Sequence, residues 1–166
     1  MRHVIEVAVR IGIVEIDRGL HELLAERFGD QGRIKIHHGD ALAGKHHLCQ
    51  FLRTELEAIE AGAGSPPVSL VANLPYSIAA PLLINLLTGP GKLNKLCFTV
   101  QKEVAERITA GPRSKAYAPL SIIVQAVCRV RSIAAVPATA FWPRPKVESQ
   151  MLRLDRVQPA ALDGRG

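Results

Sequence analysis

The feature that most restricts the fold of this chain is an apolar run, residues 68–72, that ends abruptly in Asn73-Leu74-Pro75-Tyr76. Such a run is typical of a buried strand bounded by turn-forming residues. Open α/β sheets bind their ligands beyond the carboxyl ends of their strands. The sequence therefore predicts that this strand opens into a pocket at its carboxyl end.

Strand and helix patterns alternate along the rest of the chain. Short apolar or alternating runs predict strands over 11–16, 33–37, 68–72, 96–100, 130–136 and 147–154. Helical spacing predicts helices over 20–28, 48–59, 79–87, 103–109 and 122–127, the last ambiguous because of its β-branched residues. The alternation is typical of an α/β fold whose sheet is mainly parallel, with helices on both faces. We expect the last two strands to be antiparallel to each other.

The chain of 166 residues has the length of one domain, which we expect over 1–157, followed by a disordered tail over 158–166. No apolar run approaches the roughly 18 residues that cross a membrane, and the N-terminus lacks a secretion pattern. Cys49, Cys97 and Cys128 are far apart and odd in number. They indicate free thiols in a reducing, cytoplasmic environment rather than disulfides.

Metal binding is not expected. The histidine pairs, His37-His38 and His46-His47, consist of adjacent residues whose side chains point in different directions. Neither pair has a cysteine or carboxylate at ligand spacing.

Positive charge is concentrated in the second half of the chain. Residues 1–90 hold 8 Lys/Arg and 10 Asp/Glu, whereas residues 91–166 hold 13 and 5, so the net charges are −2 and +8. Such a concentration of positive charge predicts binding to a polyanion such as RNA. The alternative is a solvated surface that happens to be basic.

The residues after the 68–72 strand suit a flat base that carries an exocyclic amine. The Asn73 amide oxygen can accept one N–H bond. Pro75 fixes its own φ and biases Leu74 toward an extended conformation, so that the Leu74 carbonyl can serve as a second acceptor. The Tyr76 ring offers a face for stacking an unstacked base. The alternative is a plain turn, because Asn and Pro both favour turns.

Further motifs follow in a fixed order. They are Val14-Glu15-Ile16-Asp17-Arg18, Gly39-Asp40-Ala41-Leu42, the stretch 101–107, Ser114-Lys115-Ala116-Tyr117, Pro119-Leu120-Ser121 and the stretch 141–149. Together with Asn73-Leu74-Pro75-Tyr76, they resemble the S-adenosylmethionine-dependent ribosomal RNA adenine N6-dimethyltransferases. That family also contains the erythromycin-resistance methylases. The resemblance covers roughly residues 13–156.

The resemblance implies a Rossmann-like class I methyltransferase sheet that binds S-adenosylmethionine. It implies N6-methylation, and dimethylation in particular, of adenine in small-subunit ribosomal RNA by a cytoplasmic monomer that binds the small ribosomal subunit and no membrane. The implied catalytic residues are Asn73, Leu74, Pro75, Tyr76 and Phe141. The implied cofactor contacts are Glu15, Ile16, Asp40, Ala41 and Asn73.

Candidate phosphate contacts lie in the basic half. They are Lys102, Arg107, Arg113, Lys115, Arg144 and Lys146. The alternative for each is an ordinary exposed charge. Trp142, beside the implied stacking residue Phe141, is either a packing residue or an RNA contact.

The chain departs from the family pattern at its N-terminal end. No G-x-G precedes Glu15, so the glycine-rich cofactor loop expected from the resemblance is not visible among these residues. Either Val4-Ile5-Glu6-Val7 is the first strand with the loop and first helix deleted, or the whole first βα unit is absent. We also expect the family's C-terminal helical domain to be absent. An alternative function is therefore a non-catalytic RNA-binding or assembly factor. A third is a DNA or protein amino-methyltransferase, because such enzymes use loops similar to Asn-x-Pro-Tyr.

Overall fold

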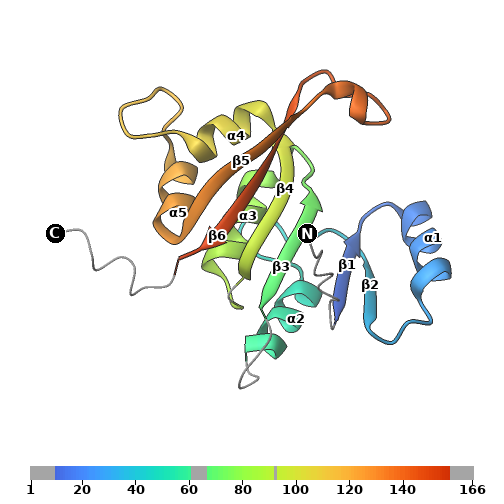
Figure 1. The fold of residues 1–166 in the computed structure, drawn as a ribbon. Helices are drawn as coiled ribbons and strands as arrows, with labels where there is room; N and C mark the ends of the chain where they lie inside the picture. Colours follow the sequence, from blue (N-terminus) through green and yellow to red (C-terminus); the bar gives the residue numbers. More distant parts are fainter. Residues whose placement is uncertain (1–9, 61–66, 92, 158–166) are drawn as a thin grey trace, which may run out of the picture. The chain divides into compact units, whose positions relative to one another are not determined.

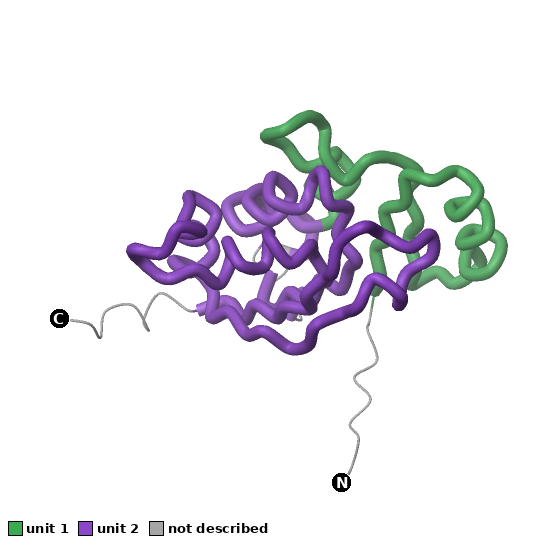
Figure 2. The backbone as a smooth tube through the Cα atoms, turned by 90° about the horizontal axis from the view of Figure 1, so that it is seen from above, with its two compact units in different colours: residues 1–55 green, residues 56–166 purple. Residues whose placement is uncertain are grey.

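The computed structural model describes residues 10–60, 67–91 and 93–157. The chain divides into two compact units, residues 1–55 and 56–166, which are coloured separately in Figure 2. Each unit is described by itself. The expected tail over 158–166 and the expected first strand over 4–7 lie outside the described residues, and the single domain expected over 1–157 stays a prediction.

Unit 1 contains a pair of parallel strands. β1 (Ile11–Glu15) and β2 (Ile34–His38) are joined through α1 (Arg18–Phe28). Asp17 caps this helix, since its carboxylate accepts a hydrogen bond of 2.8 Å from the Leu20 N–H. The Glu55 carboxylate, on α2 (Gln50–Glu60), forms ion pairs with Arg10 at 2.6 Å and Lys35 at 2.7 Å. Because β1 and β2 are parallel, both of their carboxyl ends lie at the same edge of the pair.

Unit 2 contains a four-stranded sheet in the order β3-β4-β6-β5 (Figure 1). β3 and β4 are parallel, and β6 runs antiparallel to both of its neighbours. The strands span Val68–Asn73 (β3), Leu93–Gln101 (β4), Cys128–Val136 (β5) and Ser149–Arg156 (β6). The helices span Ala79–Thr88 (α3), Lys102–Thr109 (α4) and Pro119–Val127 (α5), and a short 3-10 helix, η1, spans Ala138–Ala140.

The core of unit 2 lies on one face of this sheet. Along β4, Leu96, Phe98 and Val100 are fully buried, and Leu152 and Leu154 of β6 join them. Because side chains alternate between the faces of a strand, Cys97, Thr99 and Gln101 point to the other face and are only half-buried. The face opposite the core therefore carries Thr99, the register partner of Asn73 at the end of β3.

The structure confirms the α/β fold with parallel strand pairs and an antiparallel last strand. Residues 122–127 are helical as favoured, but α5 begins earlier, at Pro119, a residue suited to a first helical turn. The last strand was expected over 147–154 and instead begins at Ser149, because Val147 belongs to the exposed segment before it. Within the described ranges, no helix is long and apolar enough to cross a membrane.

Cys49, Cys97 and Cys128 are all free thiols, as expected. Burial raises the pKa of the Cys128 thiol to about 11, partly opposed by the positive charge of Arg156. The folded state therefore holds the thiol proton more tightly than the unfolded chain, in which the thiol pKa is 9.0. The resulting stabilisation is complete below pH 9 and is lost as the pH rises toward 11.

We accordingly expect the free energy of unfolding to fall between pH 9 and pH 11. Urea denaturation at several pH values would measure this, with Cys128→Ala as the control for the other groups that titrate there. The variant should lose less stability across this range than the unsubstituted chain. Identical pH slopes for the two proteins would contradict the assignment to Cys128.

Candidate active site at the end of strand β3

Asn73 is the last residue of β3, and its side chain is exposed rather than turned into the core. Its register partner on the parallel strand β4 is Thr99. The Thr99 hydroxyl donates a hydrogen bond to Asn73 Oδ1. An amide oxygen has two lone pairs, so one acceptor position of Asn73 remains available.

The next two residues form a rigid turn into α3. The Leu74 side chain is 2% exposed and anchors the turn, while its N–H donates to the Thr99 carbonyl at 3.0 Å. The Pro75 carbonyl accepts hydrogen bonds from Ile78 at 3.2 Å and Ala79 at 3.0 Å. The Leu74 carbonyl accepts no hydrogen bond from any residue that the structure describes. It is thus free to act as the second acceptor.

The Tyr76 ring is half-buried and tethered by its hydroxyl. Tyr76 Oη lies 3.1 Å from the Ser149 Oγ atom, and Ser149 is itself 2% exposed at the start of β6. The tether limits how far the ring can move, because the serine is fixed in the sheet. A stacking surface held in this way loses little conformational entropy when it takes up a base.

No hydrogen bond or ring contact between described residues links Phe141 with Asn73, Leu74 or Tyr76. Phe141 is half-buried directly after η1, and its N–H donates to the Ala138 carbonyl at 3.3 Å. Among the described side chains, no ring contact links Phe141 with Tyr76. Its stacking role remains a prediction. Trp142 is 96% exposed, which excludes the packing interpretation for that residue.

In unit 1, the expected cofactor residues lie at the carboxyl ends of two adjacent strands. The Gly39 N–H donates to the Glu15 carbonyl at 2.9 Å and so brings the 39–42 turn beside the end of β1. Glu15 Oε1 accepts from the Asp17 N–H at 2.8 Å, and Asp40 Oδ1 accepts from the Leu42 N–H at 2.9 Å. Each carboxylate keeps a second oxygen. Their binding roles, and those of Ile16 and Ala41, stay predictions.

The six candidate phosphate contacts differ in whether they form ion pairs with carboxylates of the chain. Lys102 pairs with Glu148 at 3.3 Å, and Arg107 pairs with Glu103 one helical turn away. The other four are exposed and form no ion pair with a described residue: Arg113, Lys115, Arg144 and Lys146. Their segments, α4–α5 and η1–β6, lie at the end of the sheet where β3 and β4 finish (Figure 1).

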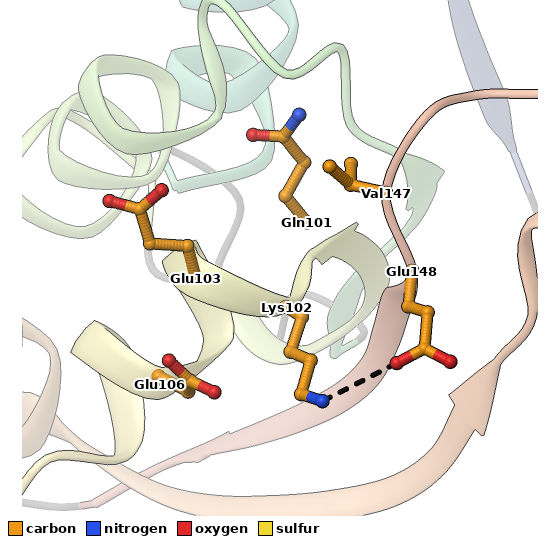
Figure 3. Close-up of a pocket in the computed structure, with 6 residues that line it drawn as sticks. All are labelled: Gln101, Lys102, Glu103, Glu106, Val147 and Glu148. Carbon is orange, nitrogen blue, oxygen red and sulfur yellow. Dashed lines mark hydrogen bonds and ion pairs between the residues drawn. The ribbon is translucent and has the colours of Figure 1, made fainter.

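A shallow cavity of about 320 Å³ lies nearby, at the start of α4. It is lined by Gln101, Lys102, Glu103, Glu106, Val147 and Glu148, and Figure 3 shows Lys102 and Glu148 pointing toward one another across it. Three carboxylates against one ammonium group disfavour a phosphate. The cavity does not include Asn73 or Tyr76, so we do not assign the base to it.

Comparison with known proteins decides the family. A family model described as ribosomal RNA adenine dimethylase matches residues 2–164. The chain belongs to the ribosomal RNA adenine dimethylase family. The resemblance found in the sequence motifs is thereby confirmed.

Relatives within the dimethylase family share more than a third of its residues. The small-subunit ribosomal RNA methyltransferase A of Clostridium perfringens is 36% identical over 155 residues, which is 93% of this chain and 50% of the relative. That of Chromohalobacter salexigens is 41% identical over 144 residues, or 86% of this chain and 48% of the relative. The chain thus spans about half the length of the curated relatives it matches.

Solved structures agree with the dimethylase fold. A dimethyladenosine transferase from Plasmodium falciparum superposes with a TM-score of 0.69 at 25% identity, covering 92% of this chain and 50% of that one. The 23S rRNA methyltransferase ErmE, at 22% identity and a TM-score of 0.60, covers 93% of this chain and 57% of its own. The latter likeness supports the Rossmann-like fold alone.

Two residues that hold the site were missed by the sequence analysis. Thr99 and Ser149 lie 26 and 73 positions from the residues they contact, Asn73 and Tyr76. Only the pairing of β4 with β3 and the position of β6 beside β4 bring them there. The parallel direction expected for the two strands does not fix their register, and the register is what places Thr99 opposite Asn73.

Proposed function

We propose that this chain carries the methyl-transfer site of an enzyme that methylates N6 of adenine in small-subunit ribosomal RNA. One observation carries the proposal: Asn73 Oδ1 and the Leu74 carbonyl are adjacent acceptors at the carboxyl end of β3, with both residues held by Thr99. Membership of the ribosomal RNA adenine dimethylase family supports the substrate class.

The two acceptors suit the chemistry of an aromatic amine. The N6 lone pair of adenine is delocalised into the ring, which makes the nitrogen a poor nucleophile. Hydrogen bonds from its two N–H groups to Asn73 and Leu74 favour a more tetrahedral nitrogen, whose lone pair is free to attack a methyl group. No strong base is needed, since the alkylated nitrogen loses its proton readily. The contribution of the protein is positioning and preorganised polarity.

The carboxylates of unit 1 fit the expected methyl donor. S-adenosylmethionine, when bound, supplies an electrophilic methyl group. The second oxygen of Glu15 can accept from the ribose hydroxyls, and the second oxygen of Asp40 can accept from the adenine amine. The hydrogen bonds that both residues already make fix the orientation of each carboxylate. For dimethylation, which the family description names, the monomethylated N6 keeps one N–H, so the second transfer would engage only one of the two acceptors.

The RNA contact is supported by charge. Residues 91–166 carry a net charge of +8. Four basic residues that form no ion pair with a described residue lie in segments at the same end of the sheet as Asn73: Arg113, Lys115, Arg144 and Lys146. Phosphate contacts position a nucleic acid without reading its sequence. We therefore expect binding to weaken steeply with added salt, as it does when cations replace counterions along a phosphate backbone.

The direct test is methyl transfer from labelled S-adenosylmethionine to unmodified small-subunit ribosomal RNA, with a DNA oligonucleotide and a peptide assayed in parallel. We expect label in the RNA alone and N6-methylated adenine in its nuclease digest by mass spectrometry. Label in DNA or peptide would indicate the third interpretation, and no label in any substrate would reject the proposed activity.

A second candidate function is a non-catalytic RNA-binding or assembly factor, which the net charge of +8 over residues 91–166 fits equally well. Calorimetric titration of the protein with S-adenosylmethionine separates the two. Heat of binding supports the enzyme, whereas its absence with retained affinity for RNA supports the binding factor.

Replacement of Tyr76 tests the stacking surface. We expect Tyr76→Ala to weaken binding of an adenine-containing RNA by about 1–3 kcal/mol, the usual contribution of one stacked base. Tyr76→Phe keeps the ring and loses only the contact with Ser149, so its affinity should stay within about threefold of the unsubstituted chain. Fluorescence anisotropy with labelled RNA measures both. Equal losses in the two variants would assign the effect to the hydroxyl and not to stacking.

A further inference from the structure

We propose that Thr99 is a positioning residue for methyl transfer, and that its hydroxyl holds the Asn73 amide in the orientation that receives the target amine. The inference rests on the proposed function, since it concerns the same site. It goes beyond that function by assigning a role to Thr99 of the neighbouring strand, which holds Asn73 and Leu74 by hydrogen bonds.

Thr99 holds the site at two successive points. Its side chain donates to Asn73 Oδ1, and its carbonyl accepts from the Leu74 N–H at 3.0 Å. The two proposed acceptors therefore belong to residues that are both bound to a single residue of the neighbouring strand. The Thr99–Asn73 register pair places the side chains on the same face of the sheet.

The rigidity of threonine makes this contact suitable for orienting an amide. A β-branched side chain has restricted χ1 freedom. Asn73 is exposed, so without Thr99 little around it would prevent rotation of its amide. A rotated amide would present its NH₂ group, a donor, to an amine whose hydrogens need acceptors. Fixing the oxygen in advance removes that unproductive state before the base arrives.

The alternative is that the bond merely joins β3 to β4. The two strands are already paired through the backbone from Val68 to Asn73. Both side chains remain accessible to solvent, and a hydrogen bond between accessible groups contributes little to stability, because water replaces it. A purely structural role therefore predicts a small change in stability and no selective change in turnover.

The first test compares Thr99→Val, which keeps the shape and loses the hydroxyl, with Thr99→Ser, which keeps the hydroxyl. We expect kcat for methylation of small-subunit ribosomal RNA to fall about tenfold in Thr99→Val, with KM for RNA and the affinity for S-adenosylmethionine within twofold. Thr99→Ser should keep kcat within about threefold. Unchanged turnover in Thr99→Val, or an equal fall in both variants, would overturn the inference.

The second test does not need activity. The ¹⁵N relaxation of the Asn73 side-chain amide reports its order on the picosecond to nanosecond timescale. We expect high order in the unsubstituted chain and Thr99→Ser, and low order in Thr99→Val. If the unsubstituted chain transfers no methyl group, the proposed function fails. The relaxation measurement still tests whether the Thr99 hydroxyl orders the Asn73 amide. An amide equally ordered in all three proteins would refute the role of Thr99.

Discussion

Asn73→Ala is expected to lower methyl transfer by at least about 100-fold, the size of effect found when a preorganised polar group is removed from a reacting centre. Affinity for RNA should stay within about threefold, because the exposed basic side chains and Tyr76 remain. Single-turnover transfer of labelled methyl groups measures the first quantity, and anisotropy with labelled RNA measures the second.

Asn94→Ala is the matched control, since it removes an asparagine at the opposite end of the same strand pair. The Asn94 amide oxygen accepts from the Val68 N–H at 2.9 Å, where β3 begins rather than where it ends. We expect this variant to transfer methyl groups at a normal rate. If Asn73→Ala lost RNA affinity as severely as turnover, Asn73 would be a binding residue and the proposed chemistry would be wrong.

Among the variants considered for stability, Phe98→Ala should lower the free energy of unfolding most. Phe98 is 2% exposed on β4, in the centre of the strands β3, β4 and β6. Truncation of a buried phenylalanine costs about 3–5 kcal/mol, because apolar contact is lost and a cavity remains. Since domains of this size are stable by only about 5–15 kcal/mol, the variant should be close to unfolding at 37 °C.

Urea denaturation measures this loss, and Val71→Ala provides the contrast. Val71 lies on β3, next to the same strand, but is 83% exposed. Its truncation should change the free energy of unfolding by no more than about 1 kcal/mol. A loss below about 1 kcal/mol in Phe98→Ala would show that the packed face of the sheet has been assigned wrongly.

Much of the fold could be predicted from the sequence because each element carries a local periodic signal. The strand expected over 68–72 and the helix over 79–87 differ from β3 and α3 by one residue. β4 and β5 begin earlier than expected, at Leu93 and Cys128, because strand pairing extends them beyond their apolar centres. Such ends depend on the partner strand, which a single segment does not specify.

For the candidate site too, only the residues that are consecutive in the sequence could be predicted. The acceptors and the ring of residues 73–76 were expected, since they are consecutive in the sequence. Thr99 and Ser149 were not, because their roles arise only when β4 and β6 are placed beside them. The pairing of Lys102 with Glu148 likewise joins residues 46 positions apart, and it makes that lysine less available to a phosphate than its sequence position indicates.

The position of β6 between β4 and β5 has a consequence for protein synthesis. β6 is made after both of its neighbours, so β4 and β5 leave the ribosome with open edges that only the later strand can close. During that interval, the growing chain exposes backbone groups that can pair with another nascent copy. We therefore expect chains stopped before Ser149 to aggregate, and slow decoding just upstream of this strand to lower the yield of native protein.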